Sequence, residues 1–294
     1  MQFLNNPKLV VADNTAFDLA SHPTDYTGGI TSEEEAKKLL IKANKTIYKE
    51  QRKLYAADNH SVLCIFQAMD AAGKDSTVRS VFTGVNPAGF KVTSFKTPSK
   101  KELGHDFLWR CNDAVPGRGI IGIFNRSHYE EVLVCKVHPS YVLGQNIPGI
   151  TTENDLTDIF WKSRYESITN WENHLSQNGT IILKFFLNVG QEEQKARFLS
   201  RIAEKKKNWK FNSGDMRERA LWPKYMHAYQ DAIQNTTSHN APWYVIPADN
   251  KPIMRAMVAS IVAEKLASLN LKYPTIGADE LAKMTEAKNI LENE

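Results

Sequence analysis

Cysteine is scarce in this chain, and long apolar runs are absent from it. The three cysteines, Cys64, Cys111 and Cys135, are odd in number and widely spaced. This pattern argues against a disulfide or metal site and indicates buried free thiols in a reducing compartment. No apolar stretch approaches the roughly 18 residues that a membrane-spanning helix needs. The first residues also lack the charged and apolar regions of a secretory signal. We therefore expect a cytoplasmic protein with no membrane partner.

Net charge is also small, at +4 over 294 residues, but it is unevenly distributed. The segments 37–53 and 201–210 are locally basic. Such a run is usually a solvated helix face, whereas beside a phosphate-binding loop it would neutralise a polyanionic ligand. The hydrophobic content of 42% is that of an ordinary globular protein. The length allows one large α/β domain or two small ones.

Five short runs rich in apolar and β-branched residues are expected to be strands. Four of them are nearly continuous, as is typical of strands buried on both faces. Helical patterns lie between successive runs, and this alternation predicts a parallel sheet with helices on both faces. Because we find no repeat and no low-complexity linker, we expect a single domain over 1–294. The five runs are 61–66, 90–95, 119–124, 180–189 and 243–248.

Three segments lie outside this alternating pattern. Residues 1–58 are expected to form a helical extension, because 32–56 are amphipathic. Residues 191–240 exceed what one crossover helix needs and are rich in Arg, Lys and aromatic residues. They suit a lid, with a plain helical hairpin as the alternative. The tail, 273–294, is polar and is expected to pack loosely.

The stretch FQAMDAAGKDST, residues 66–77, follows the first expected strand and opens a helical pattern. The general phosphate-loop pattern is G-x-x-x-x-G-K-[ST], but Ala68 replaces its first glycine and Asp75 its final hydroxyl residue. Gly73 permits close backbone approach, Lys74 can reach phosphates, and amides at a helix start face an anion. A turn that merely contains Gly-Lys is the alternative. The residues expected at phosphate are Ala71, Ala72, Gly73, Lys74, Asp75 and Ser76.

Asp70 lies within this loop, where a carboxylate would repel phosphates unless a cation intervened. Mg²⁺ takes carboxylate and phosphate oxygens together, so we expect Asp70 to hold Mg²⁺, with helix capping as the alternative. The third strand ends at Asn125 and Arg126, where phosphate-loop enzymes usually have an acidic residue near the metal. We expect Arg126 to contact phosphate oxygens and Asn125 to contact the metal.

Four motifs together resemble the family 2 polyphosphate kinases. The resemblance covers about 30–270, and SHYEEVLVCKVHP is similar to the class III subgroup. It implies Mg²⁺-dependent, reversible transfer of the terminal phosphoryl group of inorganic polyphosphate to AMP and ADP. It also implies a P-loop kinase fold like that of thymidylate kinase, with a five-stranded parallel sheet in the order 2-3-1-4-5. The motifs are DAAGKD (70–75), GVNPAGF (84–90), FNRSHYEEVLV (124–134) and APWYVIPADNK (241–251).

The resemblance also implies roles for single residues. Asp70 would hold Mg²⁺, Lys74 would bind the transferring phosphoryl group, and Arg126 would stabilise its developing charge. Glu130 falls at the position associated with accepting a monophosphate as well as a diphosphate. The residues implied at the nucleotide are Gly84, Asn86, Pro87, Tyr129 and Glu130. Those implied along the polyphosphate path are Arg201, Lys205, Lys206, Lys207 and Lys210.

Asn125 departs from the family pattern FDRS, which has aspartate at this position. Asparagine keeps the size and one acceptor oxygen but loses the charge. We interpret it as an inactivating change, with a natural asparagine as the alternative. Two rival functions remain: an ATP-dependent nucleoside monophosphate kinase, and a noncatalytic polyanion- or nucleic-acid-binding module. The module leaves Asp70, Gly73 and Lys74 unexplained, so we expect no nucleic-acid partner. We also expect a homo-oligomer, a dimer or tetramer.

Overall fold

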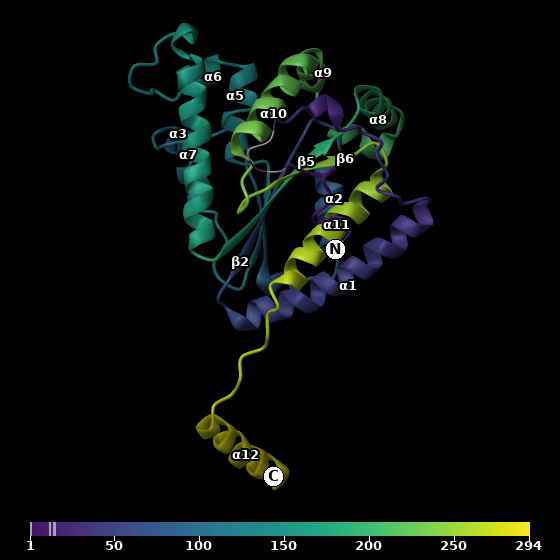
Figure 1. Cartoon of the computed structure of the whole chain (residues 1–294), viewed down its shortest axis with the longest axis vertical. Helices are drawn as coiled ribbons and strands as arrows, with labels where there is room; N and C mark the ends of the chain where they lie inside the picture. The colour runs from purple at the N-terminus through teal and green to yellow at the C-terminus, as the bar shows by residue number, and fades with distance from the viewer. Residues whose placement is uncertain (1, 12, 14–15) are drawn as a thin grey trace.

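The computed structural model describes residues 2–11, 13 and 16–294. Over these residues one sheet has the strand order β1-β6-β5-β2-β4-β3 (Figure 1). All pairs from β2 to β6 are parallel, and this core has the predicted order 2-3-1-4-5 when the five expected strands are numbered along the chain. The α/β sandwich is thereby confirmed. Its parallel strands are β2 (Ser61–Ala68), β3 (Phe90–Ser94), β4 (Ile121–Asn125), β5 (Thr180–Asn188) and β6 (Trp243–Pro247).

The prediction of a five-stranded sheet was wrong, because the sheet has a sixth, short strand. β1 (Val10–Val11) pairs antiparallel with β6 and makes the sheet mixed. Two residues are too few for a period-2 pattern to show in a sequence. Phe3 and Leu9 are fully buried, so the segment before α1 (Glu33–Ala57) is part of the core. Among the described residues of the N-terminal extension, the only α-helix is therefore α1, in its second half; the first half has the strand β1 and one short 3₁₀ turn.

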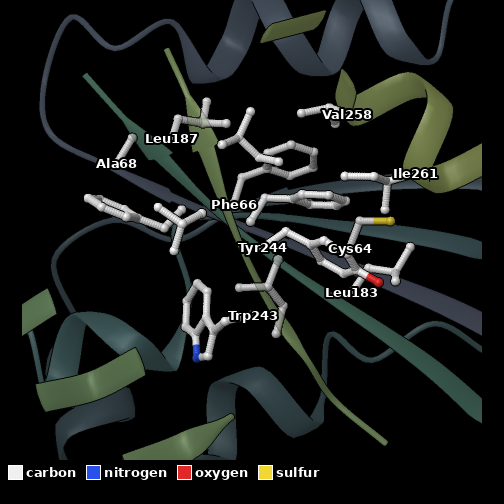
Figure 2. Packing of buried hydrophobic residues seen from close by; sticks show 14 of the residues in the cluster. Cys64, Phe66, Ala68, Leu183, Leu187, Trp243, Tyr244, Val258 and Ile261 are labelled. Atoms are coloured by element: carbon white, nitrogen blue, oxygen red, sulfur yellow. The ribbon is translucent and has the colours of Figure 1, made fainter. Parts of the chain in front are cut away.

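Helices cover both faces of the sheet (Figure 1). α1, α2 (Lys74–Val81) and α11 (Lys251–Ser268) pack together on one face. Under α11, Phe66 stacks on Phe185 with ring centroids 5.0 Å apart, and Figure 2 shows the surrounding apolar side chains. α7 (Asp158–Gln177) and α10 (Trp222–Thr236) lie on the other face. The core is therefore continuous through the sheet.

Short elements connect the main ones. They are η1 (Leu19–Ser21), η2 (Pro87–Gly89), α3 (Lys100–Leu103), α4 (Trp109–Asn112), η3 (His128–Glu131), α5 (Val134–Val137), α6 (Ser140–Leu143) and η4 (Glu153–Asp155). Three of them, α3, α5 and α6, lie beside α7 in Figure 1.

The segment expected as a lid is helical throughout most of its length. It contains α8 (Gln191–Ala203), η5 (Lys205–Lys210), α9 (Gly214–Ala220) and α10. α10 belongs to the body of the domain, because Tyr229 stacks on Phe186 of β5 with centroids 4.1 Å apart. Movement of α8, η5 and α9 as a lid stays a prediction.

The C-terminal tail forms a helix, α12 (Ala278–Glu292), with no buried residue. It stands clear of the domain at the end of an extended connection (Figure 1). Among the described residues, no helix combines the length and the apolar character needed to cross a membrane.

Candidate functional site

The predicted phosphate loop connects the end of β2 to the start of α2. Ala68, which replaces the first glycine of the pattern, is the last residue of β2. Gly73 caps α2 with φ 109°, a left-handed conformation that favours glycine. Lys74 folds back so that its Nζ donates to the Ala68 carbonyl at 2.8 Å. The first N–H groups of α2 have no partner within the helix, and they open on a cleft where an anion can accept from them.

Helix α8 holds this loop by its carbonyl groups. The buried Arg197 donates from Nη1 to the carbonyls of Ala72 at 2.7 Å and Ala71 at 3.2 Å. Gln194 donates from Nε2 to the carbonyl of Asp70 at 2.9 Å. The carbonyls are thus occupied on the α8 side. Of the residues predicted at phosphate, all but Ala72 line the cleft; Ala72 is fully buried, and its N–H donates to the Met69 carbonyl at 3.2 Å. Nothing in the sequence pattern distinguished Arg197 from the other cations of this amphipathic helix.

The cleft in front of the loop has a volume of about 590 Å³. Its lining carries nine lysine and arginine side chains against two aspartates, Asp70 and Asp75. Of the predicted polyphosphate-path residues, Arg201 and Lys207 line it, whereas Lys205 and Lys206 do not. The side chain of Lys210 lies outside the described residues. The cations that sequence reasoning missed are Arg79, Lys96, Arg197, Lys251 and Arg255.

Four of the predicted catalytic residues meet at the floor of this cleft. Arg126 Nη2 lies 3.5 Å from Asp70 Oδ1, a loose and partly exposed pair. Asn125 donates from Nδ2 to Asp75 Oδ1 at 2.7 Å. Burial lowers the pKa of Lys74; the Asp70 carboxylate opposes this shift, and the Arg126 charge adds to it. Burial would also lower the pKa of Arg126, but the carboxylates of Glu130 and Asp70 outweigh it and raise that pKa. Lys74 is therefore the cation with too little anionic charge beside it, and a phosphate group would supply it.

The side chains beside the loop offer oxygen ligands of the kind that Mg²⁺ prefers. They are the carboxylates of Asp70 and Asp75, the hydroxyl of Ser76 and the amide oxygen of Asn125. Within the described residues, no three His, Cys, Asp or Glu side chains form a metal cluster. Mg²⁺ usually keeps several waters and shares its remaining sites between one or two carboxylates and substrate phosphates. This donor set fits that pattern of binding.

A second pocket of about 440 Å³ opens on the other side of Arg126. Phe95, Leu103 and Val134 give it apolar walls. Glu130 lies at its inner edge; burial raises the pKa of this carboxyl, and the charges of Arg126 and Lys74 oppose the shift. An apolar pocket that meets a cationic cleft suits a molecule with a flat apolar part and a phosphate part.

Glu130 is held in place from beneath by Gln67. One orientation of the Gln67 amide gives both its nitrogen and its oxygen a hydrogen-bond partner. In it, the nitrogen donates to Glu130 Oε1 at 2.8 Å, and the oxygen accepts from the Ser127 hydroxyl at 3.1 Å. The predicted role of Glu130 at the acceptor stays a prediction, and its location at the pocket favours it.

The structure does not bring Gly84, Asn86 and Pro87 to the cleft. They precede β3, at the amino ends of the parallel strands, whereas Ser94 at the carboxyl end of β3 lines the cleft. Asn86 instead caps η2 by accepting from the Ala88 N–H at 3.0 Å. Their location does not favour the nucleotide contact that the resemblance implied.

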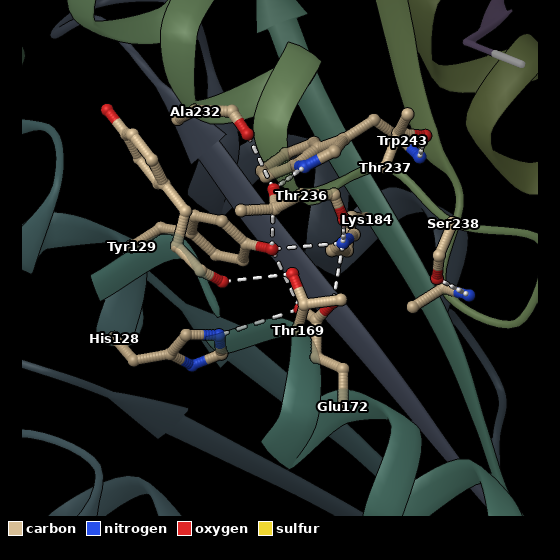
Figure 3. Close-up of polar contacts among 12 residues, drawn as sticks. His128, Tyr129, Thr169, Glu172, Lys184, Ala232, Thr236, Thr237, Ser238 and Trp243 are labelled. Atoms are coloured by element: carbon tan, nitrogen blue, oxygen red, sulfur yellow. Dashed lines mark hydrogen bonds and ion pairs between the residues drawn. The ribbon is translucent and has the colours of Figure 1, made fainter. Parts of the chain in front are cut away.

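Tyr129 is fully buried and faces the core rather than the pocket. Its hydroxyl donates to Glu172 Oε1 at 2.8 Å and accepts from Lys184 Nζ at 2.9 Å. Lys184 also donates to Glu172 Oε2 at 2.6 Å and to the Thr236 carbonyl at 2.7 Å (Figure 3). This network links η3 to β5, α7 and α10 by hydrogen bonds. It therefore fixes the buried residues Ser127–Tyr129, and with them Arg126 and Glu130 on either side. Tyr129 is better explained as part of this support than as a ligand contact.

Comparison with known proteins identifies the family. The family model described as Polyphosphate kinase 2 matches residues 30–274. The chain is 46% identical over 264 residues to an ADP-polyphosphate phosphotransferase of Rhodopseudomonas palustris, covering 90% of each chain. It is 40% identical over 268 residues to an AMP/ADP-polyphosphate phosphotransferase of Meiothermus ruber, covering 91% of this chain and 95% of the other.

A solved structure gives the same result for the fold. The crystal structure of polyphosphate kinase 2 from Arthrobacter aurescens superposes with a TM-score of 0.85 at 34% identity, covering 97% of this chain and 99% of that one. The fold is thus one already known for this family, and the match of the family model shows that the chain is a member of the polyphosphate kinase 2 family.

Proposed function

We propose that this chain transfers the terminal phosphoryl group of inorganic polyphosphate to AMP and ADP, with Mg²⁺, in a reversible reaction. The observation that carries the proposal is the charge of the cleft, in which nine cationic side chains face two carboxylates. A donor with a long run of phosphates needs many cations, whereas a single triphosphate needs few. Relatives named for polyphosphate transfer to ADP or to both AMP and ADP support the assignment.

The acceptor would bind with its base in the apolar pocket and its phosphate at Arg126. The two cavities share Phe95, Lys96 and Arg126 in their linings, so they adjoin at these residues. A nucleotide that spans this junction would present its phosphate to a donor held at Lys74. Use of both AMP and ADP, as in the class III subgroup, is supported by Glu130, which lines the apolar pocket together with Arg126.

The reaction then needs little beyond placement and neutralisation of charge. An ionised phosphate oxygen of the acceptor forms a bond to the terminal phosphorus, and the bond from that phosphorus to the rest of the chain breaks. The shortened polyphosphate leaves with the electron pair. The acceptor phosphate has a second pKa of about 6, so near neutral pH it needs no general base. Mg²⁺ held by Asp70 would neutralise the phosphate oxygens when bound.

An ATP donor is the second candidate, and one observation favours it. A further, open hollow lies between α2 and β3 and shares Asp75, Arg79 and Asn125 with the cationic cleft. Its walls include Val78, Phe82 and other apolar residues that could receive a second base. An ATP-dependent monophosphate kinase needs two nucleoside sites, and this hollow is the only candidate for the donor's base among the cavities described above.

One experiment separates the two donors. The protein is mixed with Mg²⁺ and AMP and with either polyphosphate or ATP at matched phosphoryl concentration, and the nucleotides are resolved by chromatography. Formation of ADP and then ATP from polyphosphate at a higher rate supports the proposal. A higher rate with ATP, without further conversion of ADP when polyphosphate is added, would support the monophosphate kinase.

We further propose that the protein acts in the cytoplasm, as an oligomer. All three cysteines are free and buried, and burial raises the pKa of Cys111 to about 12. Such thiols are unreactive and suit a reducing compartment. We also propose that turnover is lower with Asn125 than it would be with the aspartate of the family pattern.

A further inference from the structure

The C-terminal helix α12 has an apolar stripe that no described residue of its own chain covers. Leu281, Met284 and Leu291 are spaced three and seven residues apart on this helix, and they are 58%, 51% and 69% exposed. Spacings of three, four and seven place side chains along one face of a helix. A large apolar face on a helix that packs against nothing is a common mark of an interaction site.

Helix α1 presents a matching stripe on its outer face. Ile41, Tyr48 and Tyr55 follow one another at intervals of seven residues, and they are 56%, 44% and 47% exposed. Arg52 lies over the Tyr48 ring at 5.8 Å, and Lys45 separates Ile41 from Tyr48 on the same face. The inner face of α1 is occupied by α11, and η2 lies against one side of Tyr55. The exposed remainder of the stripe is available to a further partner.

The two helices are complementary in charge and length. α1 contains seven lysines and arginines against four glutamates, whereas α12 contains four acidic residues against two lysines. The stripe from Ile41 to Tyr55 is about 21 Å long, and α12, with 15 residues, is about 22 Å long at 1.5 Å per residue. A helix with heptad spacing and opposite net charge is thus the occupant that the α1 stripe fits best.

The connection to α12 directs the helix away from its own domain. Leu271 is the last buried residue of the chain. The segment 273–277 contains Pro274, which restricts its own φ and the conformation of Tyr273 to extended forms. In Figure 1 this segment runs outward and carries α12 clear of the α1 of the same chain. A return to that helix would require the extended segment to reverse its direction.

From these observations we propose that α12 is an exchange arm, which docks its Leu281–Met284–Leu291 face on the Ile41–Tyr48–Tyr55 stripe of α1 in a second copy of this chain. In a twofold dimer each copy gives one arm and receives one, so every contact is made twice. Two such contacts bury twice the surface area of one, which brings the interface closer to the about 1,600 Å² buried in a typical stable complex. The interface does not involve the cationic cleft, so it stands independently of the proposed reaction.

Sedimentation velocity over a range of concentrations tests the arm. The unaltered chain is expected to be dimeric or larger. Tyr48→Glu, and Leu281→Glu combined with Leu291→Glu, are each expected to raise the dissociation constant at least about tenfold. Ile159→Glu, at an apolar position of α7 that is 81% exposed, is the matched control and should leave the mass unchanged. Circular dichroism checks that each variant is folded, and unchanged association in both variants would overturn the proposal.

Cysteine pairing distinguishes exchange from docking within one chain. Two single variants, Tyr48→Cys and Met284→Cys, are co-expressed with tags of different size and then oxidised. The three natural cysteines are buried and should not interfere. A disulfide-linked product that contains one chain of each kind is expected. Absence of that product, together with an internal crosslink in the double variant Tyr48→Cys/Met284→Cys, would show that α12 folds back on its own α1 and would overturn the proposal.

Discussion

The side-chain amide of Asn125 donates to the carboxylate of Asp75 at 2.7 Å, at the point where β4 ends beside the first turn of α2. An asparagine and an aspartate can share this contact without a metal. Two aspartates at the same distance would repel each other unless a proton or a cation lay between them. The identity of residue 125 therefore decides how strongly this end of the cleft needs Mg²⁺.

Asn125→Asp is expected to make activity depend more steeply on Mg²⁺, because the added carboxylate needs a cation beside Asp75. At saturating Mg²⁺ we expect kcat for AMP phosphorylation to rise at least about tenfold, since the metal would be held more firmly where charge develops. The measurement is a Mg²⁺ titration of steady-state AMP phosphorylation by both proteins. Equal kcat values at saturation would show that the hydrogen-bonded asparagine is sufficient and that the inactivated-variant interpretation is wrong.

The donor track is predicted to follow the cations that line the cleft rather than the whole lysine run of the lid. Arg79→Ala combined with Arg255→Ala should weaken polyphosphate binding and flatten its salt dependence by roughly one to two units of slope, by analogy with phosphate contacts of nucleic acids. Lys205→Ala combined with Lys206→Ala is the matched control, because neither residue lines the cleft. Binding titrations at several salt concentrations measure both slopes. A larger effect in the control pair would place the donor along the lid surface.

Glu130 is predicted to contribute to acceptor binding while lowering the stability of the folded domain. Burial raises the pKa of its carboxyl, so the folded state binds this proton more tightly than the unfolded state and the charged form is penalised at neutral pH. Glu130→Gln is therefore expected to raise the urea midpoint at pH 7. The gain should shrink as the pH falls through the raised folded pKa, and it should be absent below the unfolded pKa of about 4.3.

The same variant should lower kcat/KM for AMP more than for ADP, if this position governs use of the monophosphate. Urea titrations at pH 7 and pH 4, with kinetics on both acceptors, give the two readouts. A stability gain without any change in the AMP-to-ADP ratio would remove Glu130 from the acceptor site.

The buried pair of Lys184 and Glu172 is predicted to be costly to break. Burial alone would raise the pKa of Glu172, but the Lys184 charge and the His128 contact outweigh it and hold that pKa below its ordinary value. Lys184→Met should destabilise the domain by about 3–5 kcal/mol, because it leaves a buried carboxylate without its cation.

A second substitution provides the control. Lys184→Met combined with Glu172→Leu should recover part of this loss, because no unpaired charge remains. The exposed pair of Lys38 and Glu34 is the surface comparison, and Lys38→Met there should cost less than about 1 kcal/mol. Urea unfolding measures all three. A double variant less stable than the single one would show that the network matters for its hydrogen bonds more than for its charges.

The sequence predicted the parallel sheet and the phosphate loop because their signals are local. Buried strands appear as continuous apolar runs, and Gly73 and Lys74 stand at a fixed spacing from the end of β2. Arg197 and Arg255 could not be found in this way, since their places at the cleft depend on how α8 and α11 pack. The distinction between Lys206 and Lys207 likewise depends on the turn of η5.

Tyr129 shows a different limit of prediction from sequence motifs. It precedes Glu130 in the chain, and a motif assigns both residues to one site. The tight turn of η3 directs Glu130 to the pocket and Tyr129 to the core, where the Tyr129 hydroxyl accepts from Lys184 Nζ and bonds to Thr236 Oγ1. Only the fold reveals these distant partners, and the same holds for β1, whose two residues become a strand because β6 has a free edge.

The choice of donor tests the central claim most directly. Initial rates of AMP phosphorylation are measured with polyphosphate and with ATP, at matched phosphoryl concentration and saturating Mg²⁺, for the chain as it stands and for Lys74→Ala as the inactive reference. The account predicts a higher rate with polyphosphate, with ADP formed first and ATP afterwards, and loss of both products in the Lys74 variant. An equal or higher rate with ATP would contradict it.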